Sequence, residues 1–299
     1  MQVEKVKQFW TNYRQCCIIK NNLHFKEGNM AFFTTSDGIK LFYDVKGEGK
    51  TIVLVHGWSM DSSAFQAQAE ELSKKYKVVV YDHRGHGKSD RPEFGLTLNR
   101  YAVDLRELIE YLNLDNILLG GWSMGASTTF EYVKTYGVEK LAAVVLFDMT
   151  PKLINDEEWK MGLWHGDYTL QNALDDMTKM NNNLADFMEP FLRRAVPYFT
   201  EEMIKPALEA AMTNTLHVMT SMWLAMAYND YRSILKNITV PTTIAHGASS
   251  TLYSAETAQY LNAQIPDSKV VPFENCTHML VLENAAKATE VLAEAAEAM

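Results

Sequence analysis

Short apolar runs separated by helix-length stretches constrain this chain more than any other feature of its sequence. The runs are TIVLVHG, KVVVYD, NILLGGW, LAAVVLFD, TTIAHG and KVVPF. Apolar runs of this length are typical of buried strands, and helical segments between them indicate βα units in a parallel sheet. The apolar residues between Thr97 and Leu114 follow the helical period of 3.6 residues, which predicts a helix. We therefore expect an α/β fold.

The rest of the chain divides around these runs. The βα rhythm stops for roughly 85 residues before TTIAHG, and apolar residues in that interval are spaced as in helices. We expect an α/β core formed by residues 31–150 and 236–299, with a helical cap at 151–235 and an N-terminal extension at 1–30. Open α/β sheets bind ligands at the carboxyl ends of their strands, where the cap should lie. The segment MLVLENAAKATEVLAEAAEAM should form a closing helix.

Composition excludes several classes of function. The chain carries 28 basic and 37 acidic residues, a net charge of −9, which disfavours nucleic acid as a partner. No run approaches the ~20 apolar residues that span a bilayer, and the N-terminal stretch lacks the apolar core of a signal peptide. Three cysteines match neither a disulfide framework nor a zinc-ligand spacing. We expect a soluble cytoplasmic protein with no membrane span, no metal and no cofactor.

The segment GWSMG, residues 121–125, lies between the apolar run NILLG and the helical stretch ASTTFEYVKTYG. This is the Gly-x-Ser-x-Gly pattern of a nucleophile elbow. A tight turn between strand and helix strains the serine and exposes its hydroxyl, and small flanking residues avoid clashes. The bare pattern is common by chance, but its strand-turn-helix context identifies Ser123 as a candidate nucleophile.

Together with two further blocks, this motif resembles the α/β-hydrolase family from about Ala31 to the C-terminus. The blocks are LVHGW at residues 54–58 and YDHRGHGKS at residues 81–89. The resemblance implies a mostly parallel eight-stranded sheet flanked by helices, with a helical cap insertion. It also implies that the backbone N–H groups of Trp58 and Met124 form an oxyanion hole.

A serine nucleophile needs a general base from elsewhere in the chain. Among eight histidines we favour His278, in FENCTHMLVLEN, because the family carries its histidine on the loop before the final helix. Thr277 stands where the family usually has glycine. The alternative for any lone histidine is a satisfied core or loop residue. His83 and His86 lie beside Asp82, but their spacing indicates turn structure more than a metal site.

The third member of a triad departs from the family's majority pattern. Most members place an acid a few residues after the His-Gly that ends the seventh strand, whereas residues 246–251 here read HGASST. A minority place it after the sixth strand, where VVLFDMTPK presents Asp148. We favour Asp148, which could alternatively cap the following segment. Asp230 and Glu274 are weaker candidates, and replacing Ser250 by alanine is expected to be mild.

The predicted cap is rich in methionine and aromatic residues. Nine of the sixteen methionines lie in it: Met161, Met177, Met180, Met188, Met203, Met212, Met219, Met222 and Met226. With aromatic residues that include Trp164 and Trp223, which we expect to bind substrate, they could line an apolar pocket. The alternative is that most of them bury the cap helices. Arg193 and Arg194 could bind a carboxylate, but a solvated face is the commoner role.

These features predict a serine hydrolase that cleaves a small to medium, largely apolar carboxylic ester or related acyl compound through an acyl-enzyme. Serine at the elbow argues against the dehalogenase and epoxide-hydrolase branches, which attack with a carboxylate. Two alternative enzymes share the serine triad: a carbon-carbon bond hydrolase and a cofactor-free perhydrolase of the haloperoxidase type. A third alternative is a non-enzymatic ligand sensor, which sustained turnover of p-nitrophenyl esters would exclude. The sequence leaves the oligomeric state open.

Overall fold

The strands form one mixed sheet in a computed structural model that describes residue 7 and residues 31–299. They are β1 (Ala31–Thr34), β2 (Lys40–Lys46), β3 (Thr51–Val55), β4 (Lys77–Tyr81), β5 (Ile117–Trp122), β6 (Leu141–Phe147), β7 (Thr242–Gly247) and β8 (Ser268–Phe273). Their order in the sheet is β1-β2-β4-β3-β5-β6-β7-β8. β2 is antiparallel to both neighbours, and the other pairs are parallel. The predicted mostly parallel eight-stranded sheet is confirmed, whereas the predicted extension at 1–30 lies outside the described residues except for Lys7.

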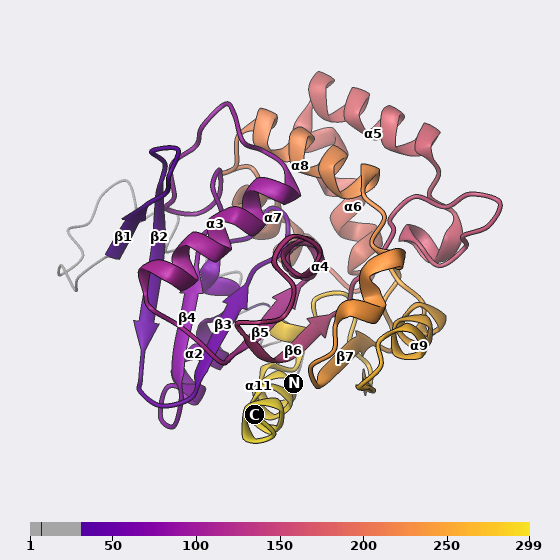
Figure 1. The fold of residues 1–299 in the computed structure, drawn as a ribbon. Helices are drawn as coiled ribbons and strands as arrows, with labels where there is room; N and C mark the ends of the chain where they lie inside the picture. The colour runs from indigo at the N-terminus through magenta and orange to yellow at the C-terminus, as the bar shows by residue number, and fades with distance from the viewer. Residues whose placement is uncertain (1–6, 8–30) are drawn as a thin grey trace.

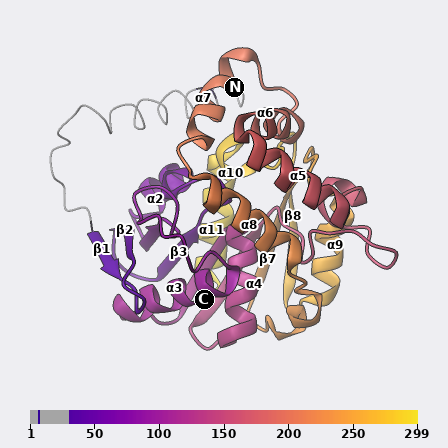
Figure 2. The ribbon, with the colours of Figure 1, turned by 90° about the horizontal axis from the view of Figure 1, so that it is seen from above.

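Helices cover both faces of this sheet. They are α2 (Gln66–Leu72), α3 (Leu98–Tyr111), α4 (Met124–Tyr136), α9 (Ala255–Gln264), α10 (Leu280–Glu283) and α11 (Ala285–Glu297), with short 3₁₀ turns η1 (Ser62–Phe65) and η3 (Arg232–Asn237). α3 packs on α4 along one face, and α2 packs on α11 along the other (Figure 2). The predicted closing helix is split in two, because Asn284 leaves helical geometry at φ −132° and caps α11 with its side chain. No helix among the described residues has the length and apolarity needed to cross a membrane.

Burial along the strands follows their place in the sheet. All five residues of β3 and all six of β5 are buried, as their apolar sequences predict. Among the described strands, β8 lies at an edge, pairs only with β7 and is partly exposed, so its run KVVPF is not the buried strand that the sequence suggested. Pro272 fits there because an edge strand needs fewer backbone donors.

The predicted helical insertion is confirmed between β6 and β7. It contains η2 (Leu163–Gly166), α5 (Leu170–Asn182), α6 (Leu184–Ala195), α7 (Glu201–Ala211) and α8 (Leu216–Tyr228). Figure 1 shows α5, α6 and α8 grouped above the strands. α8 is apolar on most sides and buries Met219, Met222 and Trp223, which explains much of the methionine content as packing.

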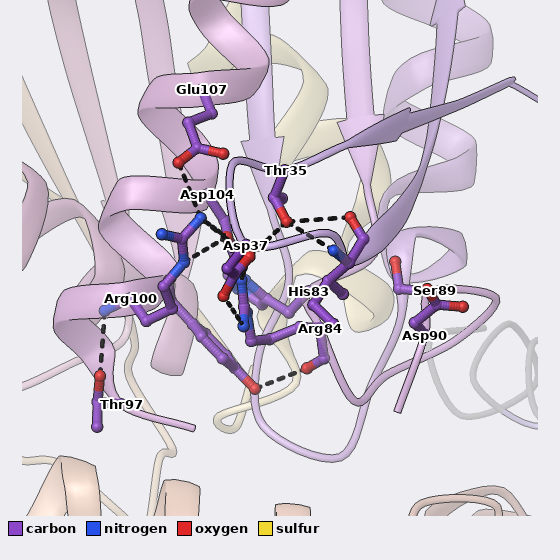
Figure 3. Close-up of polar contacts among 12 residues, drawn as sticks. Thr35, Asp37, His83, Arg84, Ser89, Asp90, Thr97, Arg100, Asp104 and Glu107 are labelled. Atoms are coloured by element: carbon purple, nitrogen blue, oxygen red, sulfur yellow. Dashed lines mark hydrogen bonds and ion pairs between the residues drawn. The ribbon is translucent and has the colours of Figure 1, made fainter. Parts of the chain in front are cut away.

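A buried ion-pair network joins the loop after β4 to α3 and to the turn after β1 (Figure 3). The Arg84 side chain is fully buried, and its guanidinium donates to Asp104 at 2.6 Å from Nε and from Nη2 and to Asp37 at 2.9 Å. Burial alone would raise the pKa of Asp37, but the hydrogen bonds and charge of Arg84 outweigh it and lower this pKa to about 2. The Asp37 contact therefore stabilises the fold fully above about pH 4, the unfolded pKa, and loses that contribution as pH falls toward 2.

We expect Arg84→Met to lower the free energy of unfolding by about 3–5 kcal/mol, because it leaves buried Asp104 without its bidentate partner. Urea denaturation at pH 7 measures the change. Arg193→Met is the matched control, since Arg193 also pairs with two carboxylates, Glu189 and Glu201, but on the surface, and it should change little. Equal midpoints for the two variants would contradict a stabilising role for the network.

Candidate active site

Ser123 occupies a strained turn between β5 and α4. Its backbone has φ 55° and ψ −120°, a conformation that L-residues rarely adopt. A Cβ atom on Gly121 would lie 2.5 Å from the Gly125 carbonyl oxygen, and one on Gly125 would lie 2.0 Å from the Val55 carbonyl oxygen. Only glycine fits either position. The turn therefore has the geometry of a nucleophile elbow, set at the end of a buried central strand.

His278 and Asp148 are hydrogen-bonded across 130 residues of sequence. The distance from His278 Nδ1 to Asp148 Oδ2 is 2.7 Å, and the Asp148 side chain is fully buried. Asp148 directly follows β6 with a left-handed φ of 43°, and His278 lies on the loop between β8 and α10. With Nδ1 held by the carboxylate, the imidazole keeps Nε2 for another partner. His278 and Ser123 line the same cavity.

Two contacts that the sequence analysis missed hold the histidine loop. The indole Nε1 of Trp122, the residue before Ser123, donates to the His278 carbonyl oxygen at 2.9 Å. The Thr277 hydroxyl and backbone N–H both donate to Glu283, which also accepts a hydrogen bond from Tyr198 of the helical insertion. Burial raises the pKa of Glu283. Threonine in place of the usual glycine thus anchors the loop to a buried carboxyl group.

The turn after β3 lies directly against Ser123. A Cβ atom on Gly57 would be 3.2 Å from the Ser123 Cβ. The backbone N–H of Trp58 belongs to the next residue in the chain and therefore lies close to Ser123. Met124 is the first residue of α4, where backbone N–H groups have no intrahelical acceptor. Within residues 31–299 neither N–H donates to a protein acceptor, so both remain available to a negatively charged oxygen.

Buried histidines fix the shape of this turn. The His83 backbone N–H donates to His56 Nε2 at 3.0 Å, so His56 carries its proton on Nδ1, which donates to the Gly57 carbonyl oxygen at 2.8 Å. Burial lowers the pKa of His56 and keeps the ring neutral. Asp82 accepts hydrogen bonds from the backbone N–H groups of Ser62 and Lys88. These contacts are those of a structural turn, as the sequence suggested.

A cavity of about 730 Å³, counted with its open mouth, adjoins Ser123 and His278. Its walls come from the core and from the helical insertion, and they include Trp58, Leu153, Leu163, Phe191, Leu192, Val196, Trp223, Met226, Leu252 and Met279. The polar side chains among the described lining residues are Ser59, Ser123, Tyr253 and His278, and none of the described lining residues is charged. The cavity therefore suits an uncharged, largely apolar group.

The two tryptophans predicted to bind substrate differ in position. Trp223 lines the cavity, and its Nε1 donates to the Tyr168 hydroxyl at 2.8 Å. Trp164 is not among the described lining residues: it has a left-handed φ of 58°, packs edge-on against Phe191 and lies under the Arg194 guanidinium at 3.8 Å from its ring centre. Trp164 thus packs behind Phe191, which lines the cavity.

Comparison with known proteins agrees with this geometry. The family model for the alpha/beta hydrolase fold matches residues 50–285, so the chain belongs to this family. It is 28% identical over 271 residues to the AB hydrolase superfamily protein YisY of Bacillus subtilis, across 88% of this chain and 97% of the relative. An esterase from Exiguobacterium antarcticum superposes with a TM-score of 0.82 at 25% identity, covering 90% of this chain and 99% of that one. A bromoperoxidase from Bacillus anthracis gives a TM-score of 0.81 at 26% identity, covering 90% and 100%.

Gly125→Ala should destabilise the protein by at least about 3 kcal/mol and abolish activity, because the new Cβ would meet the Val55 carbonyl oxygen at 2.0 Å. Gly38→Ala makes the same chemical change at a residue with positive φ and open space around it, and should cost only about 1–2 kcal/mol. Thermal and urea unfolding compare the two variants. A stable, active Gly125→Ala protein would show that the elbow relaxes without cost.

Proposed function

We propose that this protein is a serine hydrolase of small to medium carboxylic esters, with Ser123 as nucleophile, His278 as general base and Asp148 as the acid that orients it. The observation that carries the proposal is the 2.7 Å hydrogen bond from His278 to buried Asp148, because His278 lines the same cavity as the elbow serine. The family membership and the similarity to a known esterase support the same class of reaction.

The reaction follows from these positions. His278 Nε2 takes the proton of the Ser123 hydroxyl as Oγ attacks the ester carbonyl carbon. The Asp148 carboxylate keeps the proton of Nδ1 in place and stabilises the imidazolium. The N–H groups of Trp58 and Met124 bind the oxyanion of the tetrahedral intermediate. His278 then protonates the departing alcohol, and a water molecule, activated by the same imidazole, hydrolyses the acyl-enzyme.

The cavity supports an uncharged acyl group as substrate. Burying a carboxylate against Phe191, Leu192 and Trp223 would cost its hydration without an ion-pair partner. Arg193 is paired with Glu189 and Glu201, and Arg194 covers Trp164, so neither supplies one. We propose that residues 151–235 act as a cap that shapes this acyl site above a core of residues 31–150 and 236–299.

Perhydrolysis is a second candidate reaction, favoured by the 26% identity to a bromoperoxidase that covers 90% of this chain. The same acyl-enzyme would then be attacked by hydrogen peroxide in place of water, giving a peracid. Peracid formation from an ester and hydrogen peroxide, measured beside ester hydrolysis, decides between the two. The acid and base residues are the same in both reactions.

Ser123→Ala should remove nearly all p-nitrophenyl acetate hydrolysis, and Asp148→Asn should reduce kcat about 10⁴-fold, the loss typical of a triad aspartate. Asp230→Asn is the matched control, since Asp230 forms a partly exposed pair with Arg232, and it should keep wild-type rates. A fluorophosphonate should label the wild-type protein at Ser123. Sustained turnover by Ser123→Ala, with unchanged circular dichroism, would disprove the assignment.

The acyl-chain preference tests the cavity. Activity should rise from p-nitrophenyl acetate with up to about 0.8 kcal/mol of binding per added methylene, then fall when the cavity is full. Trp223→Ala should move the optimum to longer chains because it removes a lining side chain, whereas Trp164→Ala should keep the wild-type optimum. The measurement is kcat/KM for the acetate, butyrate, octanoate and palmitate esters. Identical profiles for all three proteins would show that the acyl chain does not bind in the cavity.

A further inference from the structure

The acid that serves His278 is held by residues of a different strand end. Asp148 Oδ1 accepts the Gly247 backbone N–H at 3.0 Å. Asp148 Oδ2 accepts both His278 Nδ1 at 2.7 Å and the Ser250 hydroxyl at 2.8 Å. Gly247 and Ser250 belong to the end of β7 and the loop after it. The loop that lacks a carboxylate in the sequence thus supplies two of the three donors to the carboxylate of Asp148.

The surroundings of Ser250 orient its hydroxyl proton. The backbone N–H groups of Leu252 and Tyr253 point at Ser250 Oγ from 3.3 and 3.4 Å. A hydroxyl has one proton and two lone pairs, so donors on the lone pairs leave its proton for Asp148. Ser250 is 6% exposed, and its carbonyl oxygen is held by His165 Nε2 at 2.8 Å. Its position is therefore built into the loop.

We propose that Ser250 is a positioning residue for Asp148, which it holds in place for His278. This inference rests on the proposed function. Ser250 Oγ and His278 Nδ1 bind the same oxygen atom, so the distance between them cannot exceed the sum of the two hydrogen-bond lengths.

The other titratable side chains near Asp148 and Ser250 keep their own partners. Tyr253 donates to Met149 Sδ, and Glu283 accepts from Thr277 and Tyr198.

Removing the Ser250 hydroxyl should have a kinetic signature that loss of packing lacks. The contacts of this hydroxyl revise the mild effect that the sequence alone predicts for Ser250→Ala. Without its donor, the Asp148 carboxylate is less stabilised and holds the imidazolium more tightly. Ser250→Ala should therefore lower kcat about 10-fold with little change in KM, and should move the acidic limb of the kcat/KM profile to higher pH.

The test compares Ser250→Ala, Asp148→Asn and the double variant Asp148→Asn/Ser250→Ala on p-nitrophenyl acetate, with Ser249→Ala as an exposed neighbouring control. The double variant should match Asp148→Asn, because Ser250 acts through the Asp148 carboxylate, and the control should match wild type. A Ser250→Ala protein with wild-type kcat and pH profile would overturn the positioning role. A double variant about 10-fold slower than Asp148→Asn would show that Ser250 acts by another route and would also overturn it. Loss of the proposed function itself would show separately, as full activity in Ser123→Ala.

Discussion

The parallel pairing of β5, β6, β7 and β8 is the constraint on which the site depends. In this register Trp122 lies opposite Phe147, and Phe147 lies opposite Ala245, so the strands end at one level. The backbone hydrogen bonding continues one residue beyond β5 and β6, because the N–H of Ser123 donates to the Phe147 carbonyl oxygen and the N–H of Asp148 donates to the Ala245 carbonyl oxygen. Residues that follow separate strands must therefore meet at one edge of the sheet. Backbone hydrogen bonds of the sheet therefore fix where the residues of the site begin.

Buried charges then make that edge rigid. A carboxylate removed from water is costly unless donors surround it, and each one near the site is surrounded. Asp148 accepts three hydrogen bonds, and Glu283 holds the histidine loop through Thr277. Arg84 anchors the loop after β4, whose backbone in turn fixes the ring of His56 beside the Gly57 turn. Satisfying these groups leaves little freedom in the loops that carry the polar atoms.

The sequence predicted the features that local pattern encodes. The strands follow from apolar runs, and the elbow follows from five adjacent residues around Ser123. The contacts of Trp122 with His278 and of Ser250 with Asp148 join segments more than 100 residues apart through ordinary residue types, so no local pattern marks them. Trp164 and Trp223 looked equivalent in sequence. Only the left-handed backbone at Trp164 and the packing of α6 and α8 decide which of them reaches the cavity.

The loop after β7 also contacts the helical insertion. The Thr251 hydroxyl donates to the Arg194 carbonyl oxygen at 2.6 Å, and His165 contacts the Ser250 and Leu252 carbonyl oxygens. The loop after β7 consequently links the side chain of Asp148 to the helical insertion. A fluctuation that lifts the insertion also loosens the loop beneath it, while the central strands stay intact. On heating, the proposed hydrolase activity should therefore be lost before the sheet melts.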